Sequence, residues 1–389
     1  MRRVPFVRLA LTVAVAVALQ DGAVAQTAGA LPTGGKVAAG SATIATVAPG
    51  QQRITQTSDR AIINWQGFSI GAGASVQFAQ PSSSSVVLNR VTGGDASSIL
   101  GSLSANGQVF LVNPNGIYFG RGVTLDVGGL VATTLAIKDG DFLAGRYSFS
   151  RDPSSPARAE VVNEGVITAR PGGYVVLAGD YAANRGTVEA SLGTVALASG
   201  NAMTLDVSGD KLINFAVNEK SVAALAGVDN AGQLLADGGR VIMTAATARN
   251  LAAATVNNTG LIQAQSVTEK DGAVYLSADG GTAQVSGTID VSGRQAGRTG
   301  GSVRVLGDQV ALGNTARIDA TGDAGGGQVL IGGSAHGAGP EPNATATSIA
   351  SGANINASAL ASGNGGNVVV WSDDRTDFQG AIAARGGAN

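Results

Sequence analysis

The sequence contains no cysteine and only one histidine in 389 residues. These absences exclude disulfide stapling, thiolate zinc sites, thiol nucleophiles and multi-histidine metal centres. Charged residues are also scarce, at 13% of the chain against about 25% in an average protein. Apolar residues reach 44%, so the chain has more burying capacity than the low-hydrophobicity, high-charge sequences of disordered proteins. We therefore expect a folded chain.

The first 25 residues have the features of a secretory signal peptide. Three arginines precede an apolar run over residues 9–19, and Ala23-Val24-Ala25 fits the small-x-small rule for cleavage between Ala25 and Gln26. The run is shorter than the roughly 20 residues that span a bilayer, which favours a cleaved signal over an anchor. Removing three arginines and Asp21 from 25 basic and 27 acidic residues leaves a net charge of −4, which argues against nucleic-acid binding. We expect export through the periplasm to the bacterial surface or the medium.

Two short patterns alternate along the chain from Gly165 onward. The first, Asn/Ser-x-Gly-x-Ile/Val, occurs in NEGVITA, NRGTVEA, NTGLIQA and VSGTIDVSG. The second is Gly-x-Val-x-Leu/Val, and its marker glycines are Gly173, Gly193, Gly239, Gly272, Gly301, Gly327 and Gly366. Successive markers are 20 to 46 residues apart, a spacing typical of solenoids and related repeat arrays.

The units between these glycines have the character of β-strands. Each is four to six residues long, and apolar residues alternate with small polar ones, which places one face inward and the other toward solvent. The 58 glycines oppose helix, because each costs a helix about 1 kcal/mol relative to alanine. Short strands joined by glycine corners predict an all-β fold, a right-handed parallel β-helix whose coils stabilise one another. A β-sandwich is the alternative.

The patterns divide the chain into four segments. Residues 1–25 are the signal peptide, 26–80 form an N-terminal β cap over an otherwise unpaired strand edge, 81–300 form the main β-helix, and 301–389 add further coils. Polar, proline-bearing loops interrupt the coils after Arg151 and after His336. The sequence stops in mid-pattern without a polar cap, so we expect a monomeric fragment, or a shortened relative, of a longer protein.

One turn stands out by its chemistry. In Asn113-Pro114-Asn115-Gly116-Ile117, the proline fixes φ, the first asparagine side chain can cap the turn, and the glycine accepts a positive φ. The turn joins two short apolar segments, QVFLV and IYF. Turn chemistry by itself predicts either a β-hairpin or the corner of a coil.

Five stretches of the sequence share a further resemblance: PTGGKVAAGSATI, AIINWQGFSIG, NRVTGGDASSILGSLSANGQVFLVNPNGIYFG, VVVWSDD and GAIAARGG. Together they resemble the two-partner secretion (TPS) domain of filamentous haemagglutinins and high-molecular-weight adhesins of Gram-negative bacteria. The resemblance implies a right-handed β-helix with an N-terminal cap, which addresses an exoprotein to an outer-membrane transporter with periplasmic POTRA domains. It also implies that the NPNGI residues Asn113 to Ile117 are a secretion signature. A second family motif, NPNL, is absent, which places the chain with the adhesin branch.

Other motifs give weaker indications of chemistry. Gly34-Gly35-Lys36 lacks the earlier glycine and the following Ser or Thr of a phosphate loop. Ser334 and His336 are close in sequence, but a nucleophile also needs a positioned base and an orienting group. We therefore expect no catalytic residue and no cofactor site, and the protein is not expected to be an enzyme.

Two aspartate pairs and three sequons complete the candidates. The pairs, in KDGDF and WSDD, have too few oxygen donors for a calcium loop, so we expect solvated turns and no metal site. Glycosylation sequons occur at Asn257, Asn343 and Asn356.

Three functions remain open from the sequence. The first is the N-terminal targeting domain of an adhesin-like exoprotein, whose partners are the transporter and host-cell or glycan receptors. The second is a polysaccharide-degrading β-helix enzyme, which needs clustered carboxylates where this chain has mostly Ser, Thr, Ala and Gly. The third is the N-terminal part of a contact-dependent toxin, which shares this secretion domain.

Overall fold

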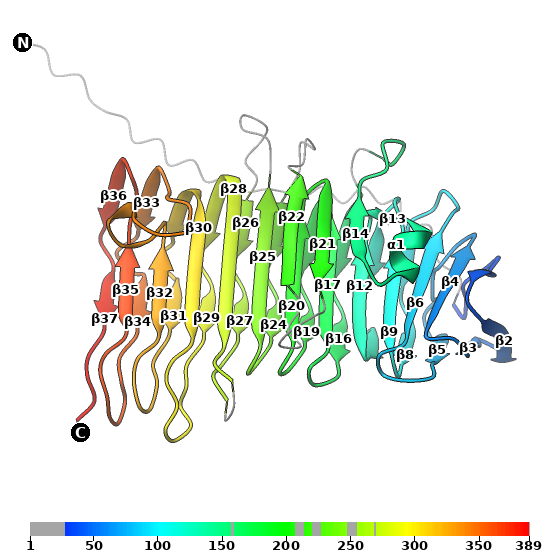
Figure 1. Ribbon diagram of the computed structural model, residues 1–389, viewed down its shortest axis with the longest axis horizontal. Helices are drawn as coiled ribbons and strands as arrows, with labels where there is room; N and C mark the ends of the chain where they lie inside the picture. The colour runs from blue at the N-terminus through cyan, green and yellow to red at the C-terminus, as the bar shows by residue number, and fades with distance from the viewer. Residues whose placement is uncertain are drawn as a thin grey trace, which may run out of the picture.

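The computed structural model describes residues 28–156, 159–206, 214–219, 227–246, 255–267 and 270–388. In Figure 1 the strands follow one another along the long axis, from the blue N-terminal end to the red C-terminal end. Nearly all regular structure in these residues is strand, and successive coils pair in parallel. The all-β parallel β-helix predicted from the repeats is therefore confirmed, and the β-sandwich is wrong.

The described strands form three sheets. The 20-stranded sheet contains β1 (Lys36–Ala39), β4 (Arg60–Trp65), β6 (Val86–Val91), β7 (Ser97–Ile99), β9 (Gln108–Val112), β10 (Ile117–Phe119), β12 (Gly129–Thr133), β15 (Glu160–Asn163), β17 (Tyr174–Gly179), β18 (Tyr181–Asn184), β20 (Thr194–Ser199), β23 (Gly227–Asn230), β25 (Arg240–Ala246), β26 (Thr255–Asn258), β28 (Ala273–Val285), β30 (Ser302–Leu312), β32 (Gln328–Ile331), β33 (Ala346–Ile349), β35 (Asn367–Val370) and β36 (Arg375–Phe378). The 13-stranded sheet contains β2 (Ala42–Ala48), β3 (Gln51–Gln56), β5 (Ser75–Ala79), β8 (Ser102–Ala105), β11 (Thr124–Val127), β16 (Val166–Ala169), β19 (Thr187–Glu189), β24 (Gln233–Leu235), β27 (Leu261–Gln263), β29 (Thr288–Asp290), β31 (Arg317–Asp319), β34 (Asn354–Asn356) and β37 (Ala381–Ala383). A four-stranded outer sheet contains β13 (Ala136–Ile137), β14 (Tyr147–Ser150), β21 (Ala202–Asp206) and β22 (Asn214–Glu219).

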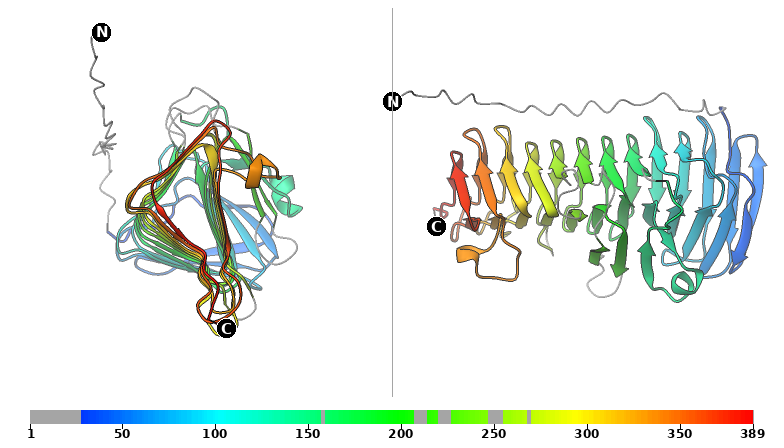
Figure 2. Two further views of the ribbon diagram at one scale, coloured as in Figure 1. Left: turned by 90° about the vertical axis from the view of Figure 1, so that its left-hand side faces the viewer. Right: turned by 90° about the horizontal axis from the view of Figure 1, so that it is seen from above.

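The second sequence pattern builds one corner and one core column of the helix. Seen along the axis, the coils superpose on a triangular outline (Figure 2). The valines of the pattern lie directly above one another inside it: Val175, Val195, Val241, Val274, Val303, Val329 and Val368. The glycines stack beside them so closely that, from Gly173 to Gly193 and on to Gly239, an added Cβ would collide with the preceding glycine's carbonyl oxygen. Only glycine fits this column, which is why the pattern repeats.

The first pattern builds a column of buried asparagines. In β15, β18, β23 and β26 the last residue is asparagine, and each donates from Nδ2 to Oδ1 of the next: Asn163 to Asn184 at 2.8 Å, Asn184 to Asn230 at 2.9 Å, and Asn230 to Asn258 at 2.8 Å. All four are fully buried. The Asn230 copy escaped the sequence pattern because Leu234 stands where the pattern requires Ile or Val. We call these four residues the asparagine ladder.

The N-terminal end is closed by antiparallel strands. β1 pairs antiparallel with β4, and β2 pairs antiparallel with β3, whereas β3 with β5 and β4 with β6 are already parallel. Beneath this cap Trp65 and Phe68 are buried with ring centroids 5.3 Å apart. Antiparallel pairing in the cap is thus limited to strands β1 to β4, and the parallel pairing that builds the coils begins at β3 and β4, before residue 81.

The outer sheet and the α-helix α1 (Asp139–Leu143) lie outside the coils, along one side of the helix (Figure 2). They pack on the outer face of the 20-stranded sheet, where Phe110 of β9 meets Phe142, Tyr147 and Phe149 with ring centroids 4.9 to 6.1 Å apart. The solvated turn that the sequence predicted at KDGDF is therefore wrong. The segment forms α1, because its Phe142 is buried against Phe110 of the sheet. In the part of the chain that the structure describes, no helix is long and apolar enough to cross a membrane.

This outer layer corrects one further expectation. Alternation predicts that each strand turns one face toward solvent, but every residue of β12, β17 and β20 is buried. Their outward side chains, such as Val131, Val176 and Ala196, contribute to a second apolar cluster beneath the outer sheet. Strands that are buried on both faces have continuous apolar sequences, and the VVLA sequence within β17 is an example.

Candidate functional site: the NPNGI corner

The segment Asn113–Ile117 lies at a corner of a coil, between β9 and β10. β9 pairs in parallel with β6 and β12, while β10 pairs in parallel with β7 and β15. The two strands that flank the corner therefore belong to the same coil and do not form a hairpin. Of the two interpretations that the turn residues allowed, the coil corner is correct.

The turn itself has the geometry that its residues predict. The backbone N–H of Gly116 donates to the Asn113 carbonyl at 3.1 Å, and Gly116 has φ of +111°. The Asn113 Oδ1 accepts the backbone N–H of Asn115 at 2.9 Å, so the side chain caps the turn. A side chain at Gly116 would be strained by this φ and would meet the Glu160 carbonyl of the next coil at 3.2 Å.

The amide groups of the corner fasten it to the preceding coil. The Asn113 Nδ2 donates to the Asp95 carbonyl and to the Ser97 Oγ, both at 3.0 Å, and the Asn115 Nδ2 donates to the Gly93 carbonyl at 2.9 Å. Asn113 and Ser97 are fully buried. We call this set of three hydrogen bonds the corner clamp.

The clamp partners Gly93, Asp95 and Ser97 were missed by sequence reasoning. They lie in NRVTGGDASS, a stretch that resembles the family. Its residue types alone do not indicate what these three residues do. The signal was coil length: Ser97 pairs with Ile117, 20 residues later, so the GGDAS loop lies directly beneath the turn. Recognising that repeat in the irregular N-terminal part would have placed the two loops together.

A second connection joins the NRVTG stretch to AIINW, one coil earlier. The Trp65 Nε1 donates to Asn89 Oδ1 at 3.0 Å, and both side chains are buried. The neighbouring Arg90 donates to Asn64 Oδ1 and forms an ion pair with Asp139 of α1 at 2.6 Å. The three stretches that resemble the family most, AIINW, NRVTG and NPNGI, are thus held together coil by coil.

The strand that follows the corner leads to a polar cluster at the surface. Glu164 accepts hydrogen bonds from the Tyr118 hydroxyl at 3.0 Å and from Arg121 at 3.1 Å, and its other oxygen accepts from Arg185 at 3.3 Å. Partial burial opposes ionisation of Glu164, but these three donors outweigh it and lower its pKa. Burial and the same hydrogen bond raise the pKa of Tyr118. Both groups keep their ordinary charge at neutral pH, so the cluster offers hydrogen bonds and no reactive base.

The corner presents little surface to a partner. Asn113, Gly116 and Ile117 are buried, and Pro114 and Asn115 are half-buried. Among the described residues, no three His, Asp or Glu side chains gather into a metal site. The arrangement can hold coils together and expose one small turn.

The remaining sequence candidates lie apart from this corner. In the cap, Lys36 opens strand β1 where a phosphate loop would open a helix. Ser334 is buried while His336 is exposed and packs against Trp371, with ring centroids 6.2 Å apart. The cleavage residues Ala25 and Gln26 lie outside the described residues.

The aspartate pairs and sequons are engaged in local contacts. In α1, Asp139 and Asp141 each form an ion pair with an arginine, and Asp373 accepts hydrogen bonds from the Trp371 and Asn343 side chains. Two sequon amides are also occupied: the Nδ2 of Asn257 donates to Asp229 at 2.7 Å, and that of Asn343 donates to the Gly337 carbonyl and to Asp373 at 3.1 Å. At the third sequon, the Oδ1 of Asn356 accepts the Ser358 N–H at 3.1 Å.

Comparison with known proteins agrees with this architecture. The family model of the TPS secretion domain matches residues 23–291. Two proteins named heme/hemopexin-binding protein, both from Haemophilus influenzae, are 34% identical over 269 and 267 residues, which are 68% and 63% of this chain. The chain spans only 29% and 28% of the length of these relatives.

A solved structure matches almost the whole chain. The crystal structure of the HMW1 secretion domain from Haemophilus influenzae superposes with a TM-score of 0.82 and 34% sequence identity, over 92% of this chain and 91% of that one. The sequence resemblance, the coil architecture and both comparisons lead to one family. The chain belongs to the TPS secretion domain family.

Proposed function

We propose that this chain is the N-terminal part of an adhesin-like exoprotein and addresses it to an outer-membrane transporter with POTRA domains. After removal of residues 1–25, the cap at 26–80 and the coils at 81–300 carry the address, and residues 301–389 add further coils. The membership in the TPS secretion domain family supports this role. Heme and hemopexin binding belong to the names of much longer relatives, and no residue here is assigned to them.

The corner clamp is the observation that carries the proposal. The side-chain amides of Asn113 and Asn115 donate their hydrogen bonds to the preceding coil, so the motif acts mainly by fixing how the first coils close. Each hydrogen bond of this kind contributes about 1 kcal/mol net, so the clamp contributes about 3 kcal/mol. Coils that close only outside the cell cannot slip back, which makes export directional without ATP in the periplasm.

Recognition of the transporter takes place by strand addition to an exposed edge, before or while the coils close. Strand β2 offers such an edge in the folded cap, because it ends the 13-stranded sheet and its only strand partner among the described residues is β3. Its Val47 is 55% exposed. A strand that has one unpaired edge and apolar side chains is a template for the addition of a further strand.

The test is secretion with the cognate transporter, combined with pull-down of the mature chain, residues 26–389, by the purified POTRA region. We expect binding by the wild-type chain and a several-fold loss of secreted protein for Asn113→Ala and Asn115→Ala. Asn367→Ala, at an exposed position of β35 far from the corner, is the matched control and leaves secretion unchanged. Absence of POTRA binding, together with unimpaired secretion of both corner variants, contradicts the proposal.

A further inference from the structure

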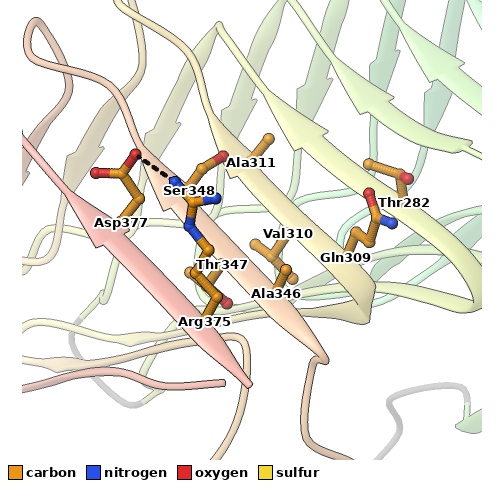
Figure 3. Close-up of a pocket in the computed structure, with 9 residues that line it drawn as sticks. All are labelled: Thr282, Gln309, Val310, Ala311, Ala346, Thr347, Ser348, Arg375 and Asp377. Carbon is orange, nitrogen blue, oxygen red and sulfur yellow. Dashed lines mark ion pairs between the residues drawn. The ribbon is translucent and has the colours of Figure 1, made fainter. Parts of the chain in front are cut away.

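A hollow of about 240 Å³ lies on the outer face of the last coils, over β28, β30, β33 and β36. Figure 3 shows Thr282 and Gln309 on one side of it and Arg375 with Asp377 on the other, with Ala311 and Ala346 between them. These residues point outward, away from the core column of Val310 and its neighbours. The hollow is far from the NPNGI corner and has no part in the proposed address.

The strand register explains why the surface is hollowed here. Thr282, Gln309, Ala346 and Arg375 pair in succession along one row of the sheet, one residue from each coil. Neighbouring strands are about 4.8 Å apart, so the long side chains of Gln309 and Arg375 stand about 10 Å apart across the small Ala346. In the adjacent row Ala311 is equally small, which extends the floor.

One of the two rows is filled in earlier coils. The row of Ala311 contains Asp229 and Asn257, whose side chains are joined by a hydrogen bond of 2.7 Å. The row of Gln309 contains Tyr181 four coils earlier and then passes through Gly227, which has no side chain. The row of Ala311 is therefore closed by a polar contact in those coils, whereas the last coils leave a recess.

The polar groups around the recess are available for a ligand. In the described part of the chain, the side chains of Thr282, Gln309 and Ser348 have no hydrogen-bond partner within the protein. The closest approach of Arg375 to Asp377 is 3.7 Å, from Nη2 to Oδ2, and the Arg375 side chain is 79% exposed. A pair this long and this exposed contributes little to stability, so Arg375 can turn to a ligand. Asp377 accepts a hydrogen bond from Gln379 at 3.3 Å on Oδ1, and its Oδ2 can accept one from a ligand.

We propose that this hollow binds a neutral oligosaccharide that lies along the helix axis. Hydroxyls, an amide, a guanidinium and a carboxylate provide both donors and acceptors within one recess, as the adjacent hydroxyls of a sugar require. The methyl groups of Ala311 and Ala346 give a flat apolar floor for the C–H face of a pyranose ring. Because Asp377 balances Arg375, the recess has no net charge to favour a phosphate or an acidic ligand.

The ligand is a chain because the polar groups are spread along the axis, with Gln309 and Arg375 at the two ends of the recess and Ser348 on the coil between them. Each coil repeats the same outward row, so a linear glycan can contact Gln309, Ser348 and Arg375 on three successive coils. A shallow recess of this size gives weak affinity, with a dissociation constant on the order of 1 mM for one short oligosaccharide. Weak contacts become useful when several copies of the protein meet a multivalent surface.

The test is saturation-transfer NMR on the purified mature chain, with maltohexaose, cellohexaose and mannohexaose as neutral probes and hexagalacturonate as the acidic one. We expect saturation transfer to at least one neutral probe. Ala346→Trp, which fills the recess, should abolish it, and Arg375→Ala and Gln309→Ala should each weaken binding about tenfold. Ala381→Trp, an exposed alanine on β37 of the other sheet, is the matched control and should bind like the wild type.

Three outcomes would overturn the proposal: no transfer to any neutral probe, transfer unchanged in Ala346→Trp, or transfer to hexagalacturonate alone. Far-UV circular dichroism and a thermal melt check that each variant is folded. If Ala346→Trp does not fold, the two exposed truncations, Arg375→Ala and Gln309→Ala, decide the question. Secretion is measured separately, so failure of this site and failure of the address remain distinguishable.

Discussion

The coils from β15 to β26 and the coils from β28 to β33 fill the same buried column with different chemistry. In the first group the column consists of the asparagine ladder, and in the second it continues as Val285, Leu312 and Ile349, all paired in register. A second column of glycines stacks beside the ladder and ends at Gly287; its members are Gly165, Gly186, Gly232, Gly260 and Gly287. The same buried position of the coil thus accepts either amides or aliphatic side chains, provided that the residues directly above and below it are of the same kind.

The difference shows what each chemistry demands. An amide in a dry column must be paired, and the ladder achieves this from Asn163, whose Oδ1 accepts the Gly165 N–H, up to Asn258. At the junction with Val285 the Nδ2 of Asn258 is buried and has no hydrogen-bond partner among the described residues. Aliphatic rungs need only volume, so they tolerate substitution better than the amide rungs do.

The largest expected effect comes from breaking the ladder in its middle. Asn184→Val removes one acceptor of the Asn163 amide, which also donates to the Gly165 carbonyl at 3.2 Å, and it removes the amide that donates to the Asn230 oxygen. Leaving the buried Asn230 oxygen without this donor, together with the lost bond of Asn163, should lower the free energy of unfolding by about 2–4 kcal/mol. Ile349→Val, in the aliphatic part of the column, is the matched control and should cost about 0.5–1.5 kcal/mol. Urea denaturation measures both, and equal losses would mean that the amide pairing is unimportant.

The glycine corners give the next effect. The Cβ of Gly186→Ala would collide with the Gly165 carbonyl, a backbone atom that cannot move without shifting a coil. We expect a loss of about 1–3 kcal/mol. At Gly313, beyond the end of the column, an added Cβ would meet the Ser286 Oγ at 2.5 Å, and that side chain can rotate away. Gly313→Ala should therefore be milder, and thermal melts that rank the two variants in the opposite order would refute this explanation.

The end of the ladder should be cheaper to change than its middle. Asn258→Val removes an amide whose Nδ2 has no partner, and it takes from Asn230 only one of two acceptors, because Asn230 also donates to the Leu261 carbonyl at 3.2 Å. We expect a loss of about 0.5–1.5 kcal/mol in urea denaturation. A loss as large as that of Asn184→Val would show that position along the ladder makes no difference.

The smallest effects concern pH. Burial raises the pKa of Asp229 despite its hydrogen bond from Asn257, so its charge costs stability at neutral pH, and this cost disappears as the pH falls through its raised pKa. Burial also opposes ionisation of Asp319, but hydrogen bonds from Thr321 and Arg294 lower its pKa. Asp319 therefore stabilises the fold at neutral pH, and this is lost as the pH falls below the ordinary aspartate pKa.

Two neutral variants test these opposite signs. Asp229→Asn should raise the free energy of unfolding in urea at pH 7, with a smaller gain at pH 4, whereas Asp319→Asn should lower it at pH 7 by at most about 1 kcal/mol. Hydrogen exchange locates each effect in its own coils. Changes of the same sign at pH 7 would contradict the difference between the two regions.

Much of the β-helix could be predicted from the sequence. The Gly-x-Val markers placed the glycine and valine columns, and Asn-x-Gly placed three of the four ladder rungs. The turn chemistry of NPNGI was also predicted. These succeeded because each depends on a local requirement that only one or two residue types meet, such as the positive φ at Gly116.

The outer layer could not be read in the same way. β14 and β21 pair in antiparallel fashion. Ser150 lies opposite Ala202, although 51 residues of the chain lie between them. A pairing of such distant residues leaves no local pattern, and α1 is too short to show helical periodicity. The partners of the NPNGI amides were missed for the same reason, since two of them are the backbone carbonyls of Gly93 and Asp95 and the third, the Ser97 hydroxyl, lies 16 residues from Asn113.

The sequence by itself determined the coil: its strands, its glycine corners, its turn at Asn113–Ile117 and the column residues that repeat at coil length. Only the tertiary structure decided which outward faces are covered by the outer sheet, which loop receives the corner clamp, and where the recess opens beside Ala346. The physical reason is range. Backbone conformation and side-chain alternation are set by neighbours in the chain, whereas cover, clamp and recess depend on residues brought together only when the coils stack.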